Sequence, residues 1–174
     1  MGFYLFDFLS IEISHGCKMA QISPIILYHG TNTIVRNPEV RISGYNKDFG
    51  FGFYCTRLER QARRWAISKR MPHIVCVYEY RPDDSLNVKI FSEMSDEWLD
   101  FVAACRHGES HSYDIVEGPM ADDEVWDYVE DFLSGRITRE AFWALARFKH
   151  PTHQIIFCTD KALQTIKFES SYEL

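Results

Sequence analysis

The sequence predicts an α+β fold, in which a split, mostly antiparallel β-sheet forms the core and helices flank it. Segments of strand type and helix type follow one another without strict alternation, which disfavours a doubly wound parallel sheet. A length of 174 residues with 46% hydrophobic residues is enough for one buried core. Because no repeat, low-complexity tract or Gly/Ser linker divides the chain, we expect one domain over 21–174, preceded by an N-terminal extension over 1–20.

Three strands and one helix are expected in the first half of the chain. Short apolar or β-branched runs predict strands at 25–30, 73–80 and 86–91. The segment 32–53 mixes Asn, Pro, Gly and charged residues, so we expect a loop there. Apolar residues at helical spacing predict a helix over 57–70, which the following proline ends.

The second half is expected to contain both kinds of element. Strands are predicted at 113–118 and 153–159, with a last edge strand at 167–174. Apolar residues at helical spacing, with Ser or Thr as helix caps, predict helices at 95–105, 125–133 and 138–148, and one helical turn at 161–166.

Charge is unevenly distributed along the chain. The net charge of -6 argues against non-specific binding to nucleic acid. The segment 57–70, however, carries six cations against the single acidic residue Glu59: Arg57, Arg60, Arg63, Arg64, Lys69 and Arg70. This segment is either a solvated helix face or a patch that meets an acidic substrate or partner.

The sequence shows no disulfide framework, zinc site or membrane segment. Its cysteines are odd in number and none has CxxC spacing: Cys17, Cys55, Cys76, Cys105 and Cys158. His107 and His111 are four residues apart but have no third ligand at a convincing spacing. The apolar N-terminus is too short to span a membrane and lacks the positive region of a signal peptide, so we expect a reduced, cytoplasmic protein.

Three short segments contain the residues that suggest chemistry. They are YHGT at 28–31, FGFGFY at 49–54 and HQIIF at 153–157. Each is common by itself, because a His at a strand end or a Gly-x-Gly turn usually has a structural role. Neither a Rossmann fingerprint nor a Walker pattern is present.

Together and in this order, the three segments resemble the ADP-ribosyltransferase superfamily of the diphtheria-toxin and poly(ADP-ribose)-polymerase type. More narrowly, the chain from about 24 to 169 resembles a bacterial family known as domain of unknown function 3990. This resemblance depends on the segments LYHGT, KDFGFGFYCT, WLDFV, YDIVEGPMADD and HQIIFCT. That family is related to ADP-ribosyltransferases and is often encoded beside a small partner, as a toxin is beside its antitoxin.

The resemblance implies that NAD is the substrate and assigns roles to single residues. His29 is expected to hydrogen-bond a ribose hydroxyl, and the backbone of Gly30 is expected to reach the nicotinamide carboxamide. Tyr54 and Trp65 are expected to flank the nicotinamide ring. The remaining expected contacts are Thr31, Gly52 and Asp122, with Gly50 shaping the loop under the ring.

The main departure from the superfamily is Gln154, which stands where an acidic residue stabilises the oxocarbenium-like transition state. Loss of one charge-assisted hydrogen bond costs about 1.5–3 kcal/mol, or one to two decades in rate. A second departure is Ala62 in place of a Ser that binds the carboxamide, and Gln61 is the candidate substitute. The candidates for a compensating carboxylate are Asp114, Glu117, Asp122 and Asp123, although acidic residues at a helix N-terminus also fit a structural role.

The sequence therefore predicts an NAD-dependent mono-ADP-ribosyltransferase with His29, Tyr54 and Gln154 as catalytic residues and no metal. Elongation to poly(ADP-ribose) is not expected without the acidic residue. The resemblance implies the toxin of a bacterial toxin–antitoxin pair, with a protein or nucleic-acid acceptor and a small antitoxin as partners. The alternative is a catalytically weak or inactive module of the same fold that binds NAD or a partner.

Overall fold

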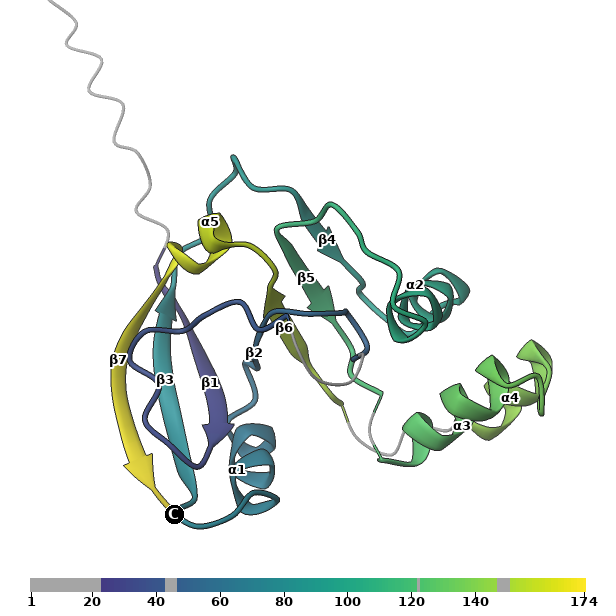
Figure 1. The fold of residues 1–174 in the computed structure, drawn as a ribbon, viewed down its shortest axis with the longest axis horizontal. Coiled ribbons are helices and arrows are strands. Elements are labelled where there is room, and N and C mark those ends of the chain that lie inside the picture. The colour runs from purple at the N-terminus through teal and green to yellow at the C-terminus, as the bar shows by residue number, and fades with distance from the viewer. Residues whose placement is uncertain (1–22, 43–46, 122, 147–150) are drawn as a thin grey trace, which may run out of the picture.

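The strands of the protein form two sheets, which lie side by side in the computed structural model (Figure 1). The model describes residues 23–42, 47–121, 123–146 and 151–174, so the expected extension over 1–20 lies outside it. One sheet has the order β1-β3-β7 and the other β2-β6-β5-β4. The strands are β1 (Ile25–Thr31), β2 (Phe53–Cys55), β3 (Ile74–Tyr80), β4 (Val88–Ile90), β5 (Ile115–Gly118), β6 (Gln154–Phe157) and β7 (Ile166–Glu173).

Antiparallel pairing dominates both sheets. The pairs β1–β3, β3–β7, β2–β6 and β5–β6 are antiparallel, and the β4–β5 pair is parallel. With five helices along the described chain, this arrangement confirms the predicted α+β class with a split, mostly antiparallel sheet. The last strand, β7, lies at the edge of its sheet as expected.

The helices cover different parts of the two sheets. Helix α1 packs on β1 and β3, whereas α2, α3 and α4 gather beyond the four-stranded sheet (Figure 1). Ser95, Thr138 and Thr159 cap α2, α4 and α5, because each side chain accepts a hydrogen bond from a backbone N–H in the first turn. The helices are α1 (Glu59–Ile67), α2 (Asp96–Arg106), α3 (Asp123–Leu133), α4 (Arg139–Leu145) and α5 (Asp160–Leu163).

The two sheets are joined where β1 approaches the end of β2. Tyr28 and Thr56 exchange two backbone hydrogen bonds, with N···O distances of 2.8 and 2.9 Å. β2 in turn pairs with β6, so that Tyr54 stands opposite Ile156. This connection brings the three motif segments of the sequence to one place in the fold.

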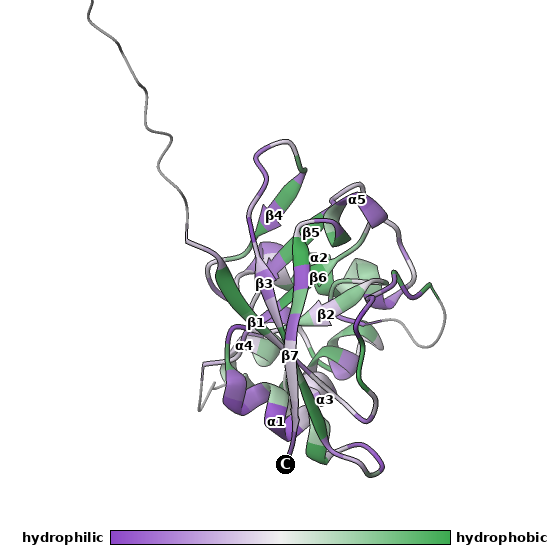
Figure 2. Ribbon diagram, turned by 90° about the vertical axis from the view of Figure 1, so that its left-hand side faces the viewer, coloured by the Kyte–Doolittle hydropathy of each residue, from purple (hydrophilic) through white to green (hydrophobic). Residues whose placement is uncertain are grey.

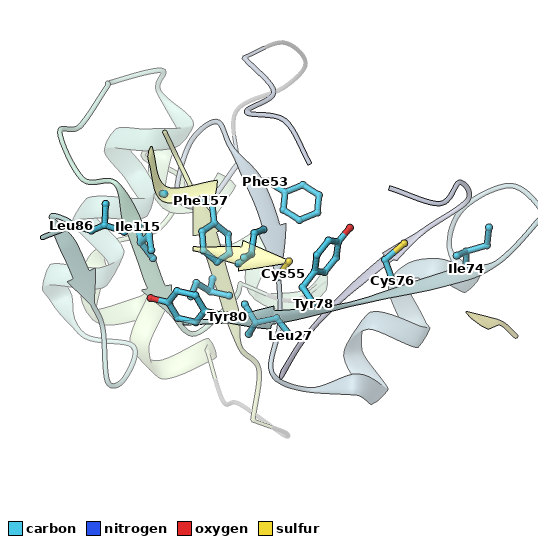
Figure 3. Packing of buried hydrophobic residues seen from close by; sticks show 13 residues of the cluster. Leu27, Phe53, Cys55, Ile74, Cys76, Tyr78, Tyr80, Leu86, Ile115 and Phe157 are labelled. Carbon is cyan, nitrogen blue, oxygen red and sulfur yellow. The ribbon is translucent and has the colours of Figure 1, made fainter. Parts of the chain in front are cut away.

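A hydrophobic core spans the two sheets. Tyr78 packs edge-on against Phe53, and Tyr80 packs edge-on against Phe157, each with ring centroids 5.5 Å apart (Figure 3). The strands β1 and β5 are largely hydrophobic, whereas α1 is largely hydrophilic (Figure 2). All six cations of 57–70 are exposed, which agrees with a solvated face.

Several element boundaries differ from the expectations, and two of the differences concern the segments next to the motif at 49–54. The three residues of β2 begin at Phe53, where the sequence suggested a loop, because pairing with β6 gives this short segment its structure. Helix α1 is shorter than 57–70. Thr56 Oγ1 accepts a hydrogen bond from the backbone N–H of Leu58 before the helix, and Ser68 caps its end.

Candidate functional site

Five of the residues predicted to contact NAD line one cavity of about 280 Å³, where the two sheets meet α1. They are His29 and Gly30 from β1, Tyr54 from β2, Trp65 from α1 and Gln154 from β6. The bridge between β1 and β2 and the pairing of β2 with β6 place these strands next to one another. The fold thus gathers side chains that lie far apart in the sequence.

His29 is held as a neutral imidazole. Its Nδ1 lies 2.7 Å from the backbone oxygen of Tyr54, and a carbonyl only accepts, so Nδ1 carries the hydrogen. Burial lowers the pKa of His29 to about 4, and the positive charges of Lys69 and Lys47 act in the same direction. The neutral ring therefore keeps Nε2 as a hydrogen-bond acceptor, which suits a ligand hydroxyl.

The phenol of Tyr54 is tied to the preceding loop. Its hydroxyl donates to the Gly50 oxygen at 2.8 Å and accepts from the Phe49 N–H at 3.3 Å. Gly50 has φ of 79°, a conformation in which a side chain is strained. Lys47 Nζ lies 4.6 Å from the centroid of the Tyr54 ring. Burial raises the pKa of Tyr54 well above its usual value, so it stays protonated.

Gly30 is required by packing. A Cβ at this position would lie 2.0 Å from the Ala62 oxygen and 2.8 Å from Trp65 Cβ, so any side chain would push α1 away from β1. The glycine thereby lets Trp65 stand beside the cavity. Ala62 lies on the fully buried face of α1 and does not line the cavity. The Ser of the polymerases thus has no counterpart at this position.

Gln61, the candidate substitute for that Ser, is engaged elsewhere. Its Nε2 donates to the His153 oxygen at 2.5 Å, and its Oε1 accepts from the His153 N–H at 3.1 Å. It is buried and does not line the cavity. Gln61 therefore fastens α1 to the start of β6.

Gln154 is buried at the first position of β6. Its amide nitrogen donates to Asp48 Oδ2 at 3.1 Å and to the Pro119 oxygen at 3.3 Å. Both acceptors lack a hydrogen to give, so the nitrogen and oxygen of the amide are unambiguously assigned. Both amide hydrogens are thus used, and Oε1 is the remaining polar atom.

Asp48 is a cavity residue that sequence reasoning missed. Its carboxylate is only 4% exposed and accepts from Arg106 Nη2 at 2.6 Å, from Arg106 Nε at 3.1 Å and from the Ala121 N–H at 2.9 Å. The Arg106 guanidinium lies 3.6 Å from the Trp126 ring centroid. One signal was present: Arg106 follows Val102 by four residues on the apolar face of its helix, where a cation indicates a buried ion pair.

Of the nominated carboxylates, the two whose side chains the structure describes, Asp114 and Glu117, do not line the cavity. Asp114 accepts from the Asn87 N–H at 2.9 Å and from Thr159 Oγ1 at 2.8 Å, and the former bond is the main cause of its lowered pKa. Glu117 binds Arg57 Nη2 at 2.7 Å and His153 Nε2 at 2.9 Å. Burial would raise the pKa of Glu117, but these bonds outweigh it and lower the pKa. Asp122 and the side chain of Asp123 lie outside the described residues.

A second cavity of about 620 Å³ adjoins the first, and the two share His29, Lys47, Tyr54 and Lys69. Thr31 and Gly52 line this second cavity rather than the first. Its charged lining residues are one acid, Glu39, and four cations: Arg36, Arg41, Lys47 and Lys69. Burial lowers the pKa of Lys47, and repulsion from the neighbouring charges of Lys69 and Arg41 acts in the same direction. An anionic ligand would relieve this repulsion.

Within the described parts of the chain, no three His, Cys, Asp or Glu residues are grouped so that they could hold a metal ion. The helices that the structure describes are all too short or too polar to cross a membrane. The cysteines at 55, 76, 105 and 158 are free thiols, while Cys17 lies outside the described residues.

Comparison with known proteins identifies the family. No curated protein matches the chain. The model of a family described as protein of unknown function (DUF3990) matches residues 25–168, which include both cavities and all strands but the end of β7. The chain therefore belongs to the DUF3990 family.

Proposed function

We propose that the protein is an NAD-dependent mono-ADP-ribosyltransferase. The observation that carries this proposal is the gathering of His29, Tyr54, Trp65 and Gln154 around one cavity that continues into a second, cation-lined cavity. The first offers aromatic rings and hydrogen-bond acceptors for a nicotinamide riboside. The second offers positive charge for a diphosphate.

In the proposed reaction, the residues position NAD and stabilise the breaking bond. Tyr54 and Trp65 flank the nicotinamide, while His29 Nε2 accepts from a ribose hydroxyl. The bond between ribose C1′ and the nicotinamide nitrogen breaks, and its electron pair leaves with nicotinamide. Gln154 Oε1 accepts from a ribose hydroxyl as positive charge develops on the sugar. A nucleophile of the acceptor then bonds to C1′ and loses its proton.

The acceptor is proposed to approach across α1. Within the described chain, Arg60, Arg64, Lys69 and Arg70 take part in no salt bridge. Trp65 and Lys69 of the same segment line the cavity, so Lys69 stands at its edge and the three arginines lie on the same exposed segment. They favour an acidic surface on a protein or nucleic acid. The role of toxin with a small antitoxin rests on the family resemblance alone.

One observation favours the alternative of a weak or inactive NAD-binding module. The carboxylate nearest Gln154 is Asp48, and Arg106 neutralises it. Charge stabilisation of the transition state is therefore smaller than in enzymes with an acidic residue at position 154.

Incubation with labelled NAD and a cell lysate tests the proposal. Transfer of ADP-ribose label to protein or nucleic acid, lost in His29→Ala and Tyr54→Ala, supports the enzyme. Thermal stabilisation by NAD without transfer supports the module, because a ligand that binds only the native state raises its stability. Absence of both contradicts either role.

A further inference from the structure

The nitrogen of the Gln154 amide lies where the surrounding protein atoms are hydrogen-bond acceptors, so only a donor fits there. Its nitrogen faces two acceptors, Asp48 Oδ2 at 3.1 Å and the Pro119 oxygen at 3.3 Å. A glutamate here would set a second carboxylate against that of Asp48 in a buried site. Like charges at this separation raise the pKa of one carboxyl or push the side chains apart.

Asp48 itself cannot turn away from Gln154. Its Oδ1 holds Arg106 through two nitrogens, and its Oδ2 also accepts from the Ala121 N–H at 2.9 Å. Arg106 is in turn held by the Trp126 oxygen and by Glu130 Oε1, each at 3.3 Å. The position of the carboxylate is therefore fixed by contacts other than the one with Gln154.

We propose that Asp48 is a positioning residue that fixes the Gln154 amide with its oxygen toward the cavity, and that it is the reason why this chain carries Gln rather than Glu at 154. The proposal rests on the proposed function. The buried negative charge at the start of this strand belongs to Asp48 and lies one contact behind the amide. In this site it orients a neutral acceptor instead of touching the ribose.

The test is a charge exchange between the two residues. Nicotinamide release from NAD, with water as acceptor, is measured for wild type, Gln154→Glu, Asp48→Asn and the double variant Asp48→Asn with Gln154→Glu. Each single change is expected to lower kcat at least about tenfold with KM changed little, because the amide loses its orientation or its acceptor role. The double variant restores a donor–acceptor contact between positions 48 and 154, even though the amide nitrogen introduced at position 48 then also faces the Ala121 N–H, and it is expected to recover about tenfold over the weaker single variant.

Glu117→Gln is the matched control, because Glu117 is the other carboxylate beside the start of β6 and does not line the cavity. It is expected to keep wild-type kcat. If Gln154→Glu does not fold by circular dichroism, Gln154→Met removes the acceptor without adding charge and is expected to show the same loss of kcat.

Gln154→Glu as active as wild type, or a double variant no better than the weaker single variant, would overturn the positioning role while leaving the proposed function intact. A wild-type protein that neither releases nicotinamide nor is stabilised by NAD would overturn the proposed function, and the positioning role with it.

Discussion

Two neighbouring residues at the start of β6 each meet a carboxylate–arginine pair, and the two pairs differ in burial. His153 binds Glu117, which pairs with Arg57, and Gln154 binds Asp48, which pairs with Arg106. The arginine side chains are 40% and 2% exposed, respectively. Successive side chains of a strand point to opposite faces. The strand therefore separates a partly exposed ion pair from a buried one that borders the candidate site. We expect the same kind of ion pair to affect stability differently on the two faces.

The largest difference is expected in stability. Arg106→Met leaves the buried Asp48 carboxylate uncompensated and should lower the free energy of unfolding by about 3–5 kcal/mol. Arg57→Met disturbs a partly exposed pair and should cost about 1 kcal/mol or less. Urea denaturation of both variants measures the two losses. Equal losses would show that burial does not separate the two pairs.

Acid should lower the stability of the fold mainly through His29, which lines the cavity. The pKa of His29 is lowered from 6.5 to about 4, so the neutral form stabilises the fold above pH 6.5 and this contribution is lost as pH falls toward 4. The loss is on the order of 3 kcal/mol. Thermal or urea unfolding across this range should show a shallower pH dependence for His29→Gln than for wild type. An identical pH dependence would mean that His29 ionises freely in the folded protein.

Glu117, which lies away from the cavity, provides the comparison for the pH dependence of stability. Its pKa is lowered, so its contribution is present above its unfolded pKa and is lost as pH falls through the folded value. Because the pair is partly exposed, Glu117→Gln should change the pH dependence less than His29→Gln does.

The sequence predicted more of the fold than of the site. Strand β6 and the caps Ser95 and Thr138 were readable, because apolar alternation and capping are local properties. Strand β2 could not be predicted, because three residues are too few to show an alternation of apolar and polar side chains. Its structure depends on pairing with β6.

The candidate site was predicted in part. His29, Tyr54, Trp65 and Gln154 line one cavity as the motifs suggested, although their roles toward NAD stay predictions. Asp48 was missed because its partners Arg106 and Gln154 lie 58 and 106 residues away, and a cation on the apolar face of a helix does not indicate which distant acid it pairs with. Glu117 was among the carboxylates nominated instead, although it lies with His153 on the face of β6 opposite to Gln154.

A smaller effect is expected in NAD affinity. Arg41→Ala removes one cation from the second cavity and should weaken NAD binding about tenfold, because a charge-assisted contact with a phosphate is lost. Arg57→Ala, a cation outside both cavities, should leave the affinity within about twofold. Calorimetric titration with NAD separates the two. Equal weakening by both would point to a general electrostatic effect.

The smallest effect is expected on the transfer rate when Glu117, on the face of β6 opposite to Gln154, is changed. Glu117→Gln should keep transfer within about twofold of wild type, because Glu117 is joined to Arg57 and His153 outside the cavity. Initial rates of label transfer measure this. A tenfold or greater loss would indicate that Glu117, on the other face of β6, acts in the reaction in place of Gln154.

The most direct measurement is a crystal structure of the complex with NAD. The account predicts the nicotinamide between Tyr54 and Trp65, a ribose hydroxyl within hydrogen-bond distance of His29 Nε2 and Gln154 Oε1, and the diphosphate among the cations of the second cavity. NAD bound beside Glu117, on the face of β6 opposite to Gln154, or bound away from both cavities, would contradict this prediction.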